Sequence, residues 1–269
     1  MKIIYKILLG FLFITGSPFH LNAADKLKIG VTAGPHIDIL QDLKERASKK
    51  DLELEFIEFN DFILPNIALA EGEIDLNIYQ HRPFLESQKA TRGFDFTDFG
   101  KTILLPMGVY SLKYKSLDDV PRTGKVAIPN DPTNGGRALL VLQDLGILKL
   151  KEGVGSEAMV TDIIENPKHL KIVEVEAPQL PRSLEDVDIA VINTDWVLVA
   201  GLDPSTALAR ENKDSPYTNI IVVRTKDKNR KALKTFKKLY QSEPTKTFIE
   251  KRFKGAVLAA WEVKTPPSE

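Results

Sequence analysis

Two successive series of alternating strand and helix patterns constrain the fold of this chain most strongly. In the first series, apolar and polar residues alternate over 27–32 and 52–56, and apolar residues recur at helical spacing over 37–47. Helices are also predicted over 63–70 and 82–89, with a short strand over 74–78 between them. Strands that alternate with helices predict a mainly parallel sheet with right-handed crossovers.

The pattern restarts after an extended apolar segment, 101–111. Strands are predicted over 125–128, 170–175 and 189–192, with helices over 132–145, 183–186 and 194–200. A strand over 219–224 and helices over 230–240 and 245–253 complete the chain. The 269 residues are enough for two modest cores. The sequence therefore predicts an α/β fold of two lobes, joined by crossovers near 101–111 and 219–224.

The first residues have the features of a secretory signal peptide. Lys2 and Lys6 precede an apolar run over 7–14, and small residues follow at Ala23 and Ala24. The run is shorter than the roughly 20 residues that span a membrane, and the lysines disfavour a buried strand. We therefore predict a signal peptide over 1–23, a first lobe from 24–109 plus 222–261, a second lobe over 110–221, and a disordered tail over 262–269.

Charge and composition exclude several classes of function. The formal net charge is zero, so we expect no nucleic-acid partner. There is no cysteine, hence neither a disulfide nor a lipidated cysteine, and we expect a soluble protein in the periplasm or outside the cell. Four histidines without ligand spacing predict no metal site. We expect no cofactor and no catalytic residues, because P-loop, dinucleotide-binding and nucleophile-elbow motifs are missing.

Polar residues concentrate where the predicted strands end, at the sheet edge where open α/β proteins bind ligands. These clusters are Gly34, 59–62, 79–84, 130–137 and Asn193, joined by 217–219 at the start of a late strand. Asp61, Asp131 and Asp195 lie near them, although aspartate is common in turns.

Segment 127–137 runs from a strand through a tight polar turn into a helix. A helix N-terminus favours an anion, and Gly135 and Gly136 permit close approach of a ligand to the backbone. Arg137, one turn into the helix, is suited to hold a carboxylate through two parallel hydrogen bonds. Asn134 is equally typical of a turn or helix cap, and an arginine on a helix is usually exposed. We interpret the segment as a site for a small anionic group.

A second cluster mixes aromatic and polar residues. Phe62, Tyr79 and Phe84 are compatible with a buried core or with an aromatic pocket. His81 lies among them, and a single histidine is more often structural than a ligand or a base.

The chain resembles the periplasmic methionine-binding proteins of ABC-type methionine importers, the NlpA-type family of substrate-binding lipoproteins. The resemblance covers about 27–261, and its most distinctive segments are 58–62, 79–85, 127–137, 176–184, 190–194 and 215–219. It implies a two-lobed periplasmic-binding-protein fold, type II-like, with two crossover strands and a central ligand cleft. It also implies that Arg137 holds an amino-acid carboxylate and that Asn193 and Asn219 fix the amino and carboxylate groups.

The resemblance further implies a side-chain pocket formed by Phe62, Tyr79, His81 and Phe84, and we place Asn134 at the same site. The implied function is capture of L-methionine or a close analogue for an ABC permease and its ATPase, by a monomer that meets the membrane only through the transporter. The chain departs from the family in having no lipidated cysteine and in carrying Trp196, which would alter the pocket if it faced the cleft.

Three alternatives remain open: a binder of another small amino acid or a methionine-containing dipeptide, an enzyme acting on a small carboxylic acid, and a surface protein that contacts a host or matrix molecule.

Overall fold

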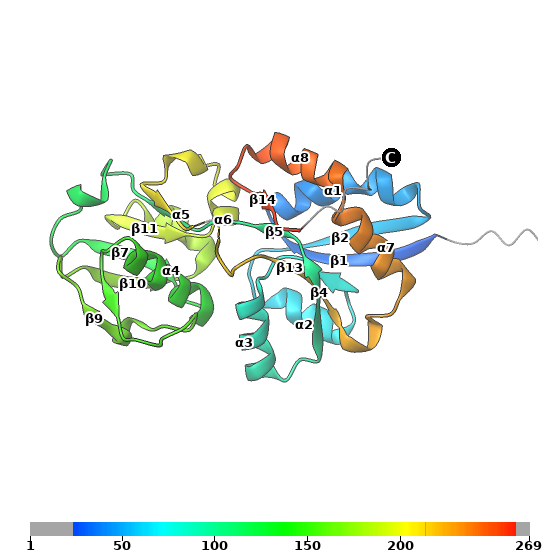
Figure 1. Cartoon of the computed structure of the whole chain (residues 1–269), viewed down its shortest axis with the longest axis horizontal. Helices are drawn as coiled ribbons and strands as arrows, with labels where there is room; N and C mark the ends of the chain where they lie inside the picture. Colours follow the sequence, from blue (N-terminus) through cyan, green and yellow to red (C-terminus); the bar gives the residue numbers. More distant parts are fainter. Residues whose placement is uncertain (1–23, 213, 262–269) are drawn as a thin grey trace, which may run out of the picture.

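The computed structural model describes residues 24–212 and 214–261, so the predicted signal peptide and the predicted tail lie outside the described residues. Two lobes lie side by side along the longest axis (Figure 1). Within the described part of the chain, no helix has both the length and the apolar character needed to cross a membrane.

The first lobe is built on a five-stranded sheet in the order β2-β1-β3-β13-β4, with β13 antiparallel to its neighbours and β1 parallel to β2 and β3. Its strands are β1 (Asp25–Thr32), β2 (Leu52–Phe59), β3 (Leu76–Asn77), β4 (Phe96–Lys101) and β13 (Ile220–Arg224). Its helices are α1 (Pro35–Ser48), α2 (Leu64–Glu71), α3 (Arg82–Arg92), α7 (Lys231–Tyr240) and α8 (Glu243–Phe253).

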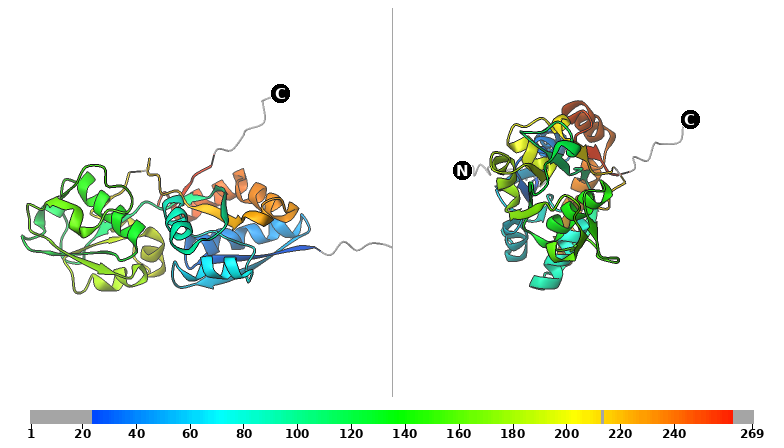
Figure 2. Two further views of the ribbon diagram at one scale, coloured as in Figure 1. Left: turned by 90° about the horizontal axis from the view of Figure 1, so that it is seen from below. Right: turned by 90° about the vertical axis from the view of Figure 1, so that its left-hand side faces the viewer.

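Side chains of successive strand residues point to opposite faces, and this alternation divides the core of the first lobe into two layers. In β13, Ile221 and Val223 pack with residues of α1, α7 and α8, whereas Ile220 and Val222 pack with residues of α2 and α3. Helices therefore cover both faces of this sheet (Figure 2). This explains why β13 is apolar at four consecutive positions.

The second lobe repeats the plan with a sheet in the order β10-β7-β11-β6-β12. Its strands are β6 (Gly108–Tyr110), β7 (Lys125–Pro129), β10 (Lys171–Val175), β11 (Ile189–Ile192) and β12 (Ala209–Arg210). Its helices are α4 (Pro132–Asp144), α5 (Leu180–Ser183) and α6 (Thr194–Val199). The predicted two-lobed α/β fold is thus confirmed.

Two short crossovers join the lobes and are hydrogen-bonded to each other. The Thr102 amide donates to the Asn219 carbonyl and the Asn219 amide donates to the Ile103 carbonyl, each over 2.8 Å. β14 (Leu258–Ala259) pairs with β5 (Ile103–Leu104) beside them. β6 belongs to the second sheet and β13 to the first. We therefore propose that the chain passes between the lobes within 102–107 and within 211–219. Both boundaries lie a few residues before those predicted from the sequence, which fall after residues 109 and 221.

The structure adds strands that the sequence patterns did not indicate. β4, β12 and β14 lie at sheet edges or in short pairs, and β8 (Lys149–Leu150) pairs with β9 (Ile163–Glu165). The short helix predicted over 183–186 is displaced toward the N-terminus, because a helical turn over Ala177–Gln179 leads directly into α5. Except for the six-residue β4, these elements have four residues or fewer, so their identity depends on pairing partners distant in sequence.

Candidate ligand-binding site

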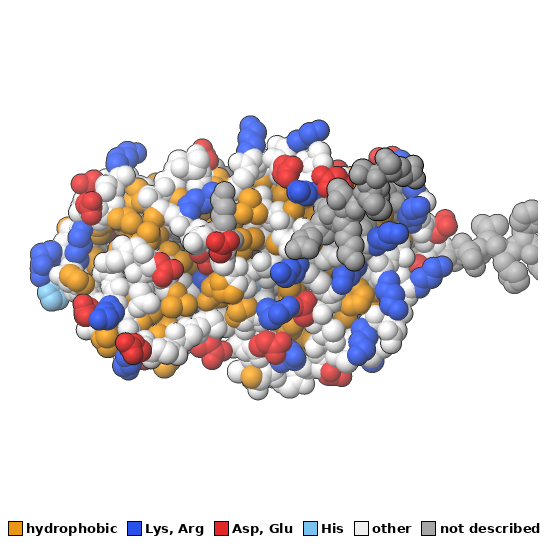
Figure 3. Space-filling model, in the orientation of Figure 1, with side chains coloured by type: hydrophobic (Ala, Val, Ile, Leu, Met, Phe, Trp, Pro, Cys, Tyr) orange, Lys and Arg blue, Asp and Glu red, His pale blue; other side chains and the backbone are white. Residues whose placement is uncertain are grey.

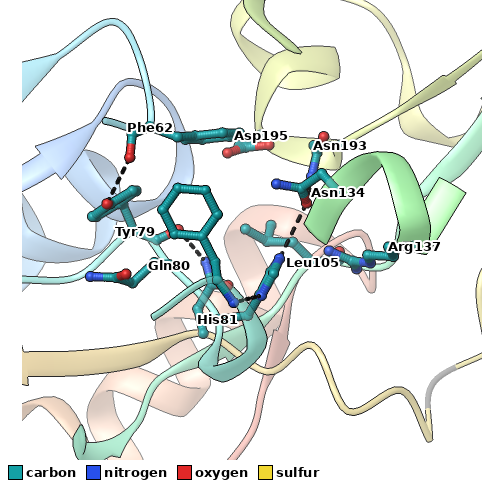
Figure 4. A pocket seen from close by; sticks show the side chains of 11 residues that line it. Phe62, Tyr79, Gln80, His81, Leu105, Asn134, Arg137, Asn193 and Asp195 are labelled. Atoms are coloured by element: carbon teal, nitrogen blue, oxygen red, sulfur yellow. Dashed lines mark hydrogen bonds between the residues drawn. The ribbon is translucent and has the colours of Figure 1, made fainter. Parts of the chain in front are cut away.

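A small cavity lies between the two lobes (Figure 4). Its walls come from both lobes and from both crossovers: Phe62, Tyr79, Gln80, His81, Phe84, Leu105, Asn134, Arg137, Asn193, Asp195 and Asn219. All eight residues predicted from the sequence line this one cavity, and their individual roles toward a ligand stay predictions.

The sequence prediction omitted three of the lining residues. Gln80 lies within a segment that follows a predicted strand, and Asp195 has the sequence context of an ordinary turn aspartate. Leu105 comes from the first crossover, where an apolar residue carries no signal of a site.

A hydrogen-bond chain fixes the polar wall. Asp131 caps α4 by accepting from the Asn134 amide, and both Asp131 oxygens accept from Asn134 Nδ2 over 3.0 Å. Asn134 Oδ1 therefore faces away from Asp131, and it accepts from Asn193 Nδ2 over 2.9 Å. His81 Nε2 lies 3.2 Å from the same oxygen and acts as a donor. This contact links the two lobes.

The hydrogen bonds of His81 also determine which of its ring nitrogens carries the proton. Its Nδ1 accepts from the Phe84 amide over 3.1 Å and so caps α3, which leaves the proton on Nε2. Burial lowers the pKa of His81 to about 3, and the nearby Arg137 charge acts in the same direction. His81 is therefore a neutral structural donor in the cavity wall at neutral pH.

The expectation that the N-terminus of α4 cradles an anion is wrong. Asp131 supplies the cap, and its carboxylate would repel a second anion there. Nor do the two glycines make room for a ligand: a Cβ on Gly135 would lie 2.8 Å from the Pro129 carbonyl oxygen, and one on Gly136 would lie 2.3 Å from the Ser156 carbonyl oxygen. These glycines let α4 pack against the protein backbone.

Arg137 is only 3% exposed and is already paired. Its Nε and Nη2 donate to the two carboxylate oxygens of Glu211 over 3.0 and 2.5 Å, and Nη2 also donates to the Leu105 carbonyl over 2.9 Å. The guanidinium carbon lies 4.5 Å from the centre of the Tyr217 ring. The two guanidinium nitrogens that could form parallel hydrogen bonds to a ligand carboxylate are thus already bonded to Glu211. Nη1 is the nitrogen without a hydrogen-bond partner among the described residues.

The side chain of Asn219 is fixed by two hydrogen bonds from its Nδ2. Its Nδ2 donates to the Tyr79 carbonyl and to His36 Nε2, each over 3.0 Å. Burial lowers the pKa of His36 to about 3, so His36 is neutral and accepts this bond. Asn219 Oδ1 is the side-chain atom that remains for a ligand.

The other wall is aromatic. The ring of Phe62 lies 6.1 Å from that of Tyr79 and 6.3 Å from that of Phe84, and the Tyr79 hydroxyl donates to the Phe62 carbonyl over 2.8 Å. Trp196 does not line the cavity. Its ring lies 5.4 Å from Phe62, so it supports that ring from the second lobe.

Metal and nucleophile chemistry find no support in this geometry. Over residues 24–212 and 214–261, no three His, Cys, Asp or Glu side chains lie close enough together to hold a metal ion. The lining residues include no serine, threonine, cysteine or lysine.

Charged side chains of both signs are interspersed over the face seen in Figure 3.

The chain matches known proteins over nearly its whole length. The model of the NlpA lipoprotein family matches residues 27–261. The D-methionine-binding lipoprotein MetQ of Yersinia pestis is 43% identical over 94% of this chain and 95% of its own, and Lipoprotein 28 of Escherichia coli K12 is 40% identical over 95% of both. A nutrient-binding protein of Burkholderia cenocepacia, solved bound to methionine, is 49% identical with a TM-score of 0.85, and it matches 87% of this chain and 100% of its own. This chain belongs to the NlpA lipoprotein family.

Proposed function

We propose that this protein is an extracytoplasmic solute-binding protein of an ABC importer and that it binds L-methionine or a close analogue between its lobes. The observation that carries the proposal is the division of the cavity. A guanidinium and three asparagine amides lie on the second lobe and the crossovers, whereas Phe62, Tyr79 and Phe84 lie on the first. The one lining amide of the first lobe, that of Gln80, is bonded to Asn66 and Asn77. One wall suits the polar end of an amino acid and the other suits its side chain.

The free Nη1 of Arg137 is the donor that we assign to the ligand carboxylate. Asn193 and Asn219 are assigned to the polar end, and Asn134 orients Asn193 through its side-chain oxygen. The thioether then lies against Phe62, Tyr79, His81 and Phe84, where each sulfur–ring contact contributes roughly 0.3–1.5 kcal/mol. A ligand held by both lobes favours the closed arrangement over an open one.

The related proteins support the same function. Those named for methionine, and the one solved with it, match this chain almost from end to end. A protein from Coxiella burnetii that is 40% identical, with a TM-score of 0.84, is described as the periplasmic substrate-binding protein of an ABC transporter. The proposed partners are therefore a permease and its ATPase, and the proposed location is outside the cytoplasm. Although relatives are named lipoproteins, this sequence has no cysteine.

Isothermal titration calorimetry on protein freed of bound ligand by unfolding and refolding tests the proposal. A panel of amino acids is titrated, together with methionine-containing dipeptides. We expect L-methionine to bind at least about tenfold more tightly than L-alanine, because each buried methylene contributes about 0.8 kcal/mol. Preference for another amino acid or for a dipeptide would reassign the ligand, and no binding across the panel would contradict the function.

The related proteins disfavour an enzyme on the same scaffold, because they are named or described as binding proteins. Native mass spectrometry of the protein incubated with methionine separates the two classes, because a binding protein leaves the mass of the ligand unchanged.

A further inference from the structure

Asp195, at the start of α6, is a buried carboxylate without a cationic partner. Its side chain is 4% exposed and lines the cavity, and Figure 4 shows it beside Asn193. Its hydrogen-bond partner among the described residues is the Trp196 amide, which donates to Oδ1 over 3.1 Å. No lysine, arginine or histidine in the described chain forms a salt bridge with it. A buried carboxylate in this state is costly unless something else compensates its charge.

The arginine across the cavity does not serve as that partner. Arg137 gives two of its nitrogens to Glu211, which is 8% exposed. The guanidinium is therefore paired mainly with Glu211, and its charge compensates the carboxylate of Asp195 only in part. Asp131, also near the cavity, is satisfied by donors from Asn134 and Thr133.

A second unpaired acceptor lies near Asp195. Asn193 donates through Nδ2 to Asn134, and the direction of that chain is fixed by Asp131, so Asn193 Oδ1 must be an acceptor. This oxygen is buried and has no hydrogen-bond partner among the described residues. The wall near the start of α6 thus presents a carboxylate that accepts one hydrogen bond, from the Trp196 amide, and an amide oxygen that accepts none from the described residues.

A primary ammonium group has the chemistry that complements this wall. It carries one positive charge and three N–H donors and accepts nothing. We propose that Asp195 and Asn193 Oδ1 together bind the ammonium group of the ligand, which makes a free amino group a requirement for tight binding. This assignment rests on the proposed function and deepens it, since it selects α-amino acids against the corresponding hydroxy or deaminated acids.

Burial supports the assignment. It raises the pKa of Asp195 to about 6, with partial compensation from the Trp196 amide and the Arg137 charge. The other titratable groups that line the cavity are Tyr79, His81 and Arg137, and Asp131 lies behind Asn134. Burial lowers the pKa of His81 to about 3 and raises the pKa values of Tyr79 and Asp131, so His81 and Tyr79 are neutral near pH 7. An arriving ammonium ion compensates the charge of Asp195, so ligand binding near pH 6 should release a proton from it.

The test compares two ligands on two proteins by calorimetry at pH 7.5. The ligands are L-methionine and 2-hydroxy-4-(methylthio)butanoate, which has a hydroxyl in place of the amino group. The proteins are the wild type and Asp195→Asn. We expect Asp195→Asn to weaken methionine binding about 10- to 100-fold, the range for a lost hydrogen bond to a charged group, and to change binding of the hydroxy acid less than about threefold. Equal losses for both ligands, or no loss for methionine, would overturn the assignment.

The outcomes separate this inference from the proposed function. Wild-type protein that binds another amino acid instead of methionine argues against methionine only, and the comparison is then repeated with that amino acid and its hydroxy acid. Wild-type protein that binds no amino acid contradicts both. A melting temperature for ligand-free Asp195→Asn at or above that of the wild type shows that the variant folds, because the substitution removes a buried charge that is compensated only in part.

Discussion

At the scale of single residues, Arg137 combines two tasks, and its substitution should affect both. Arg137→Ala removes the proposed carboxylate donor and leaves Glu211 buried without its partner. We expect a loss of roughly 2–5 kcal/mol in methionine binding free energy. Unfolding free energy should fall by roughly 3–5 kcal/mol as well. Calorimetry and urea denaturation measure the two losses separately.

A second variant distinguishes these tasks. Adding Glu211→Gln to Arg137→Ala removes the orphaned charge, so part of the unfolding free energy should return while methionine binding remains weak. Recovery of binding together with stability would mean that Arg137 acts on the fold and does not contact the ligand.

The buried titratable residues predict how stability depends on pH. His36 and His81 have pKa values of about 3 in the folded protein against an ordinary value of 6.5. Each is held neutral by the fold, so its contribution is present above pH 6.5 and is lost as the pH falls from there toward 3. The loss is about 1.4 kcal/mol per pH unit per histidine.

The shifted pKa of Asp195 has the opposite effect on how stability depends on pH. Its pKa of about 6 lies above the ordinary 3.8, so protonation between these values favours the folded state. We expect the unfolding free energy of ligand-free protein to fall between pH 6 and pH 4, and to fall more steeply in Asp195→Asn. Urea denaturation at several pH values measures both slopes. A slope in the variant equal to that of the wild type would contradict the pKa shift of Asp195.

At the scale of elements, α4 must approach the loop at 156–158 closely to position Arg137. A Cβ on Gly136 would meet the Ser156 carbonyl oxygen at 2.3 Å and the Ala158 nitrogen at 2.7 Å, and backbone atoms there cannot rotate away. Gly136→Ala should therefore cost about 1–3 kcal/mol of unfolding free energy and weaken methionine binding, because α4 is displaced.

Gly155→Ala is the matched control. A Cβ at Gly155 has no neighbour within 4 Å, so its effect should stay within about 0.5 kcal/mol. Denaturation curves of the two variants provide the comparison. Equal effects would show that contact with the 156–158 loop does not set the position of α4.

The elements also show how far the sequence alone predicts this structure. The periodic segments 27–32 and 37–47 and the short apolar run 189–192 are predicted correctly, because their apolar residues reflect burial on one face or on both. The two-residue strand β12 has no such period, and its pairing with β6 depends on the assembled second lobe.

For the site, the sequence predicts which residues come together but not how they pair. Strand ends brought all eight expected residues together, since the carboxyl edges of both sheets meet at the cavity. Pairing could not be predicted: Glu211 is 74 positions from Arg137 in the chain, and nothing near Glu211 marks it as the guanidinium partner. Asp195 was missed for a related reason, because burial distinguishes it from a turn aspartate and burial is a property of the fold.

At the scale of the whole molecule, the two lobes contact each other around the cavity as well as through the crossovers. The His81–Asn134 hydrogen bond and the Phe62–Trp196 ring contact connect them across the cavity. A ligand that adds contacts to both lobes should shift the protein toward this closed arrangement.

Small-angle X-ray scattering tests this closure. We expect the radius of gyration of ligand-free protein to decrease when methionine is added, whereas Arg137→Ala at the same methionine concentration should show no decrease. An unchanged radius in the wild type at saturating methionine would indicate that the lobes are closed without ligand.

The central claim is that the cavity between the lobes holds an amino acid with its polar end at Arg137 and its side chain at the aromatic wall. A crystal structure of the protein with L-methionine tests it most directly. We predict a ligand carboxylate oxygen within about 3.2 Å of Arg137 Nη1, the thioether among Phe62, Tyr79 and Phe84, and the Arg137–Glu211 pair intact. Methionine bound elsewhere, or bound with its side chain toward Arg137, would contradict this account.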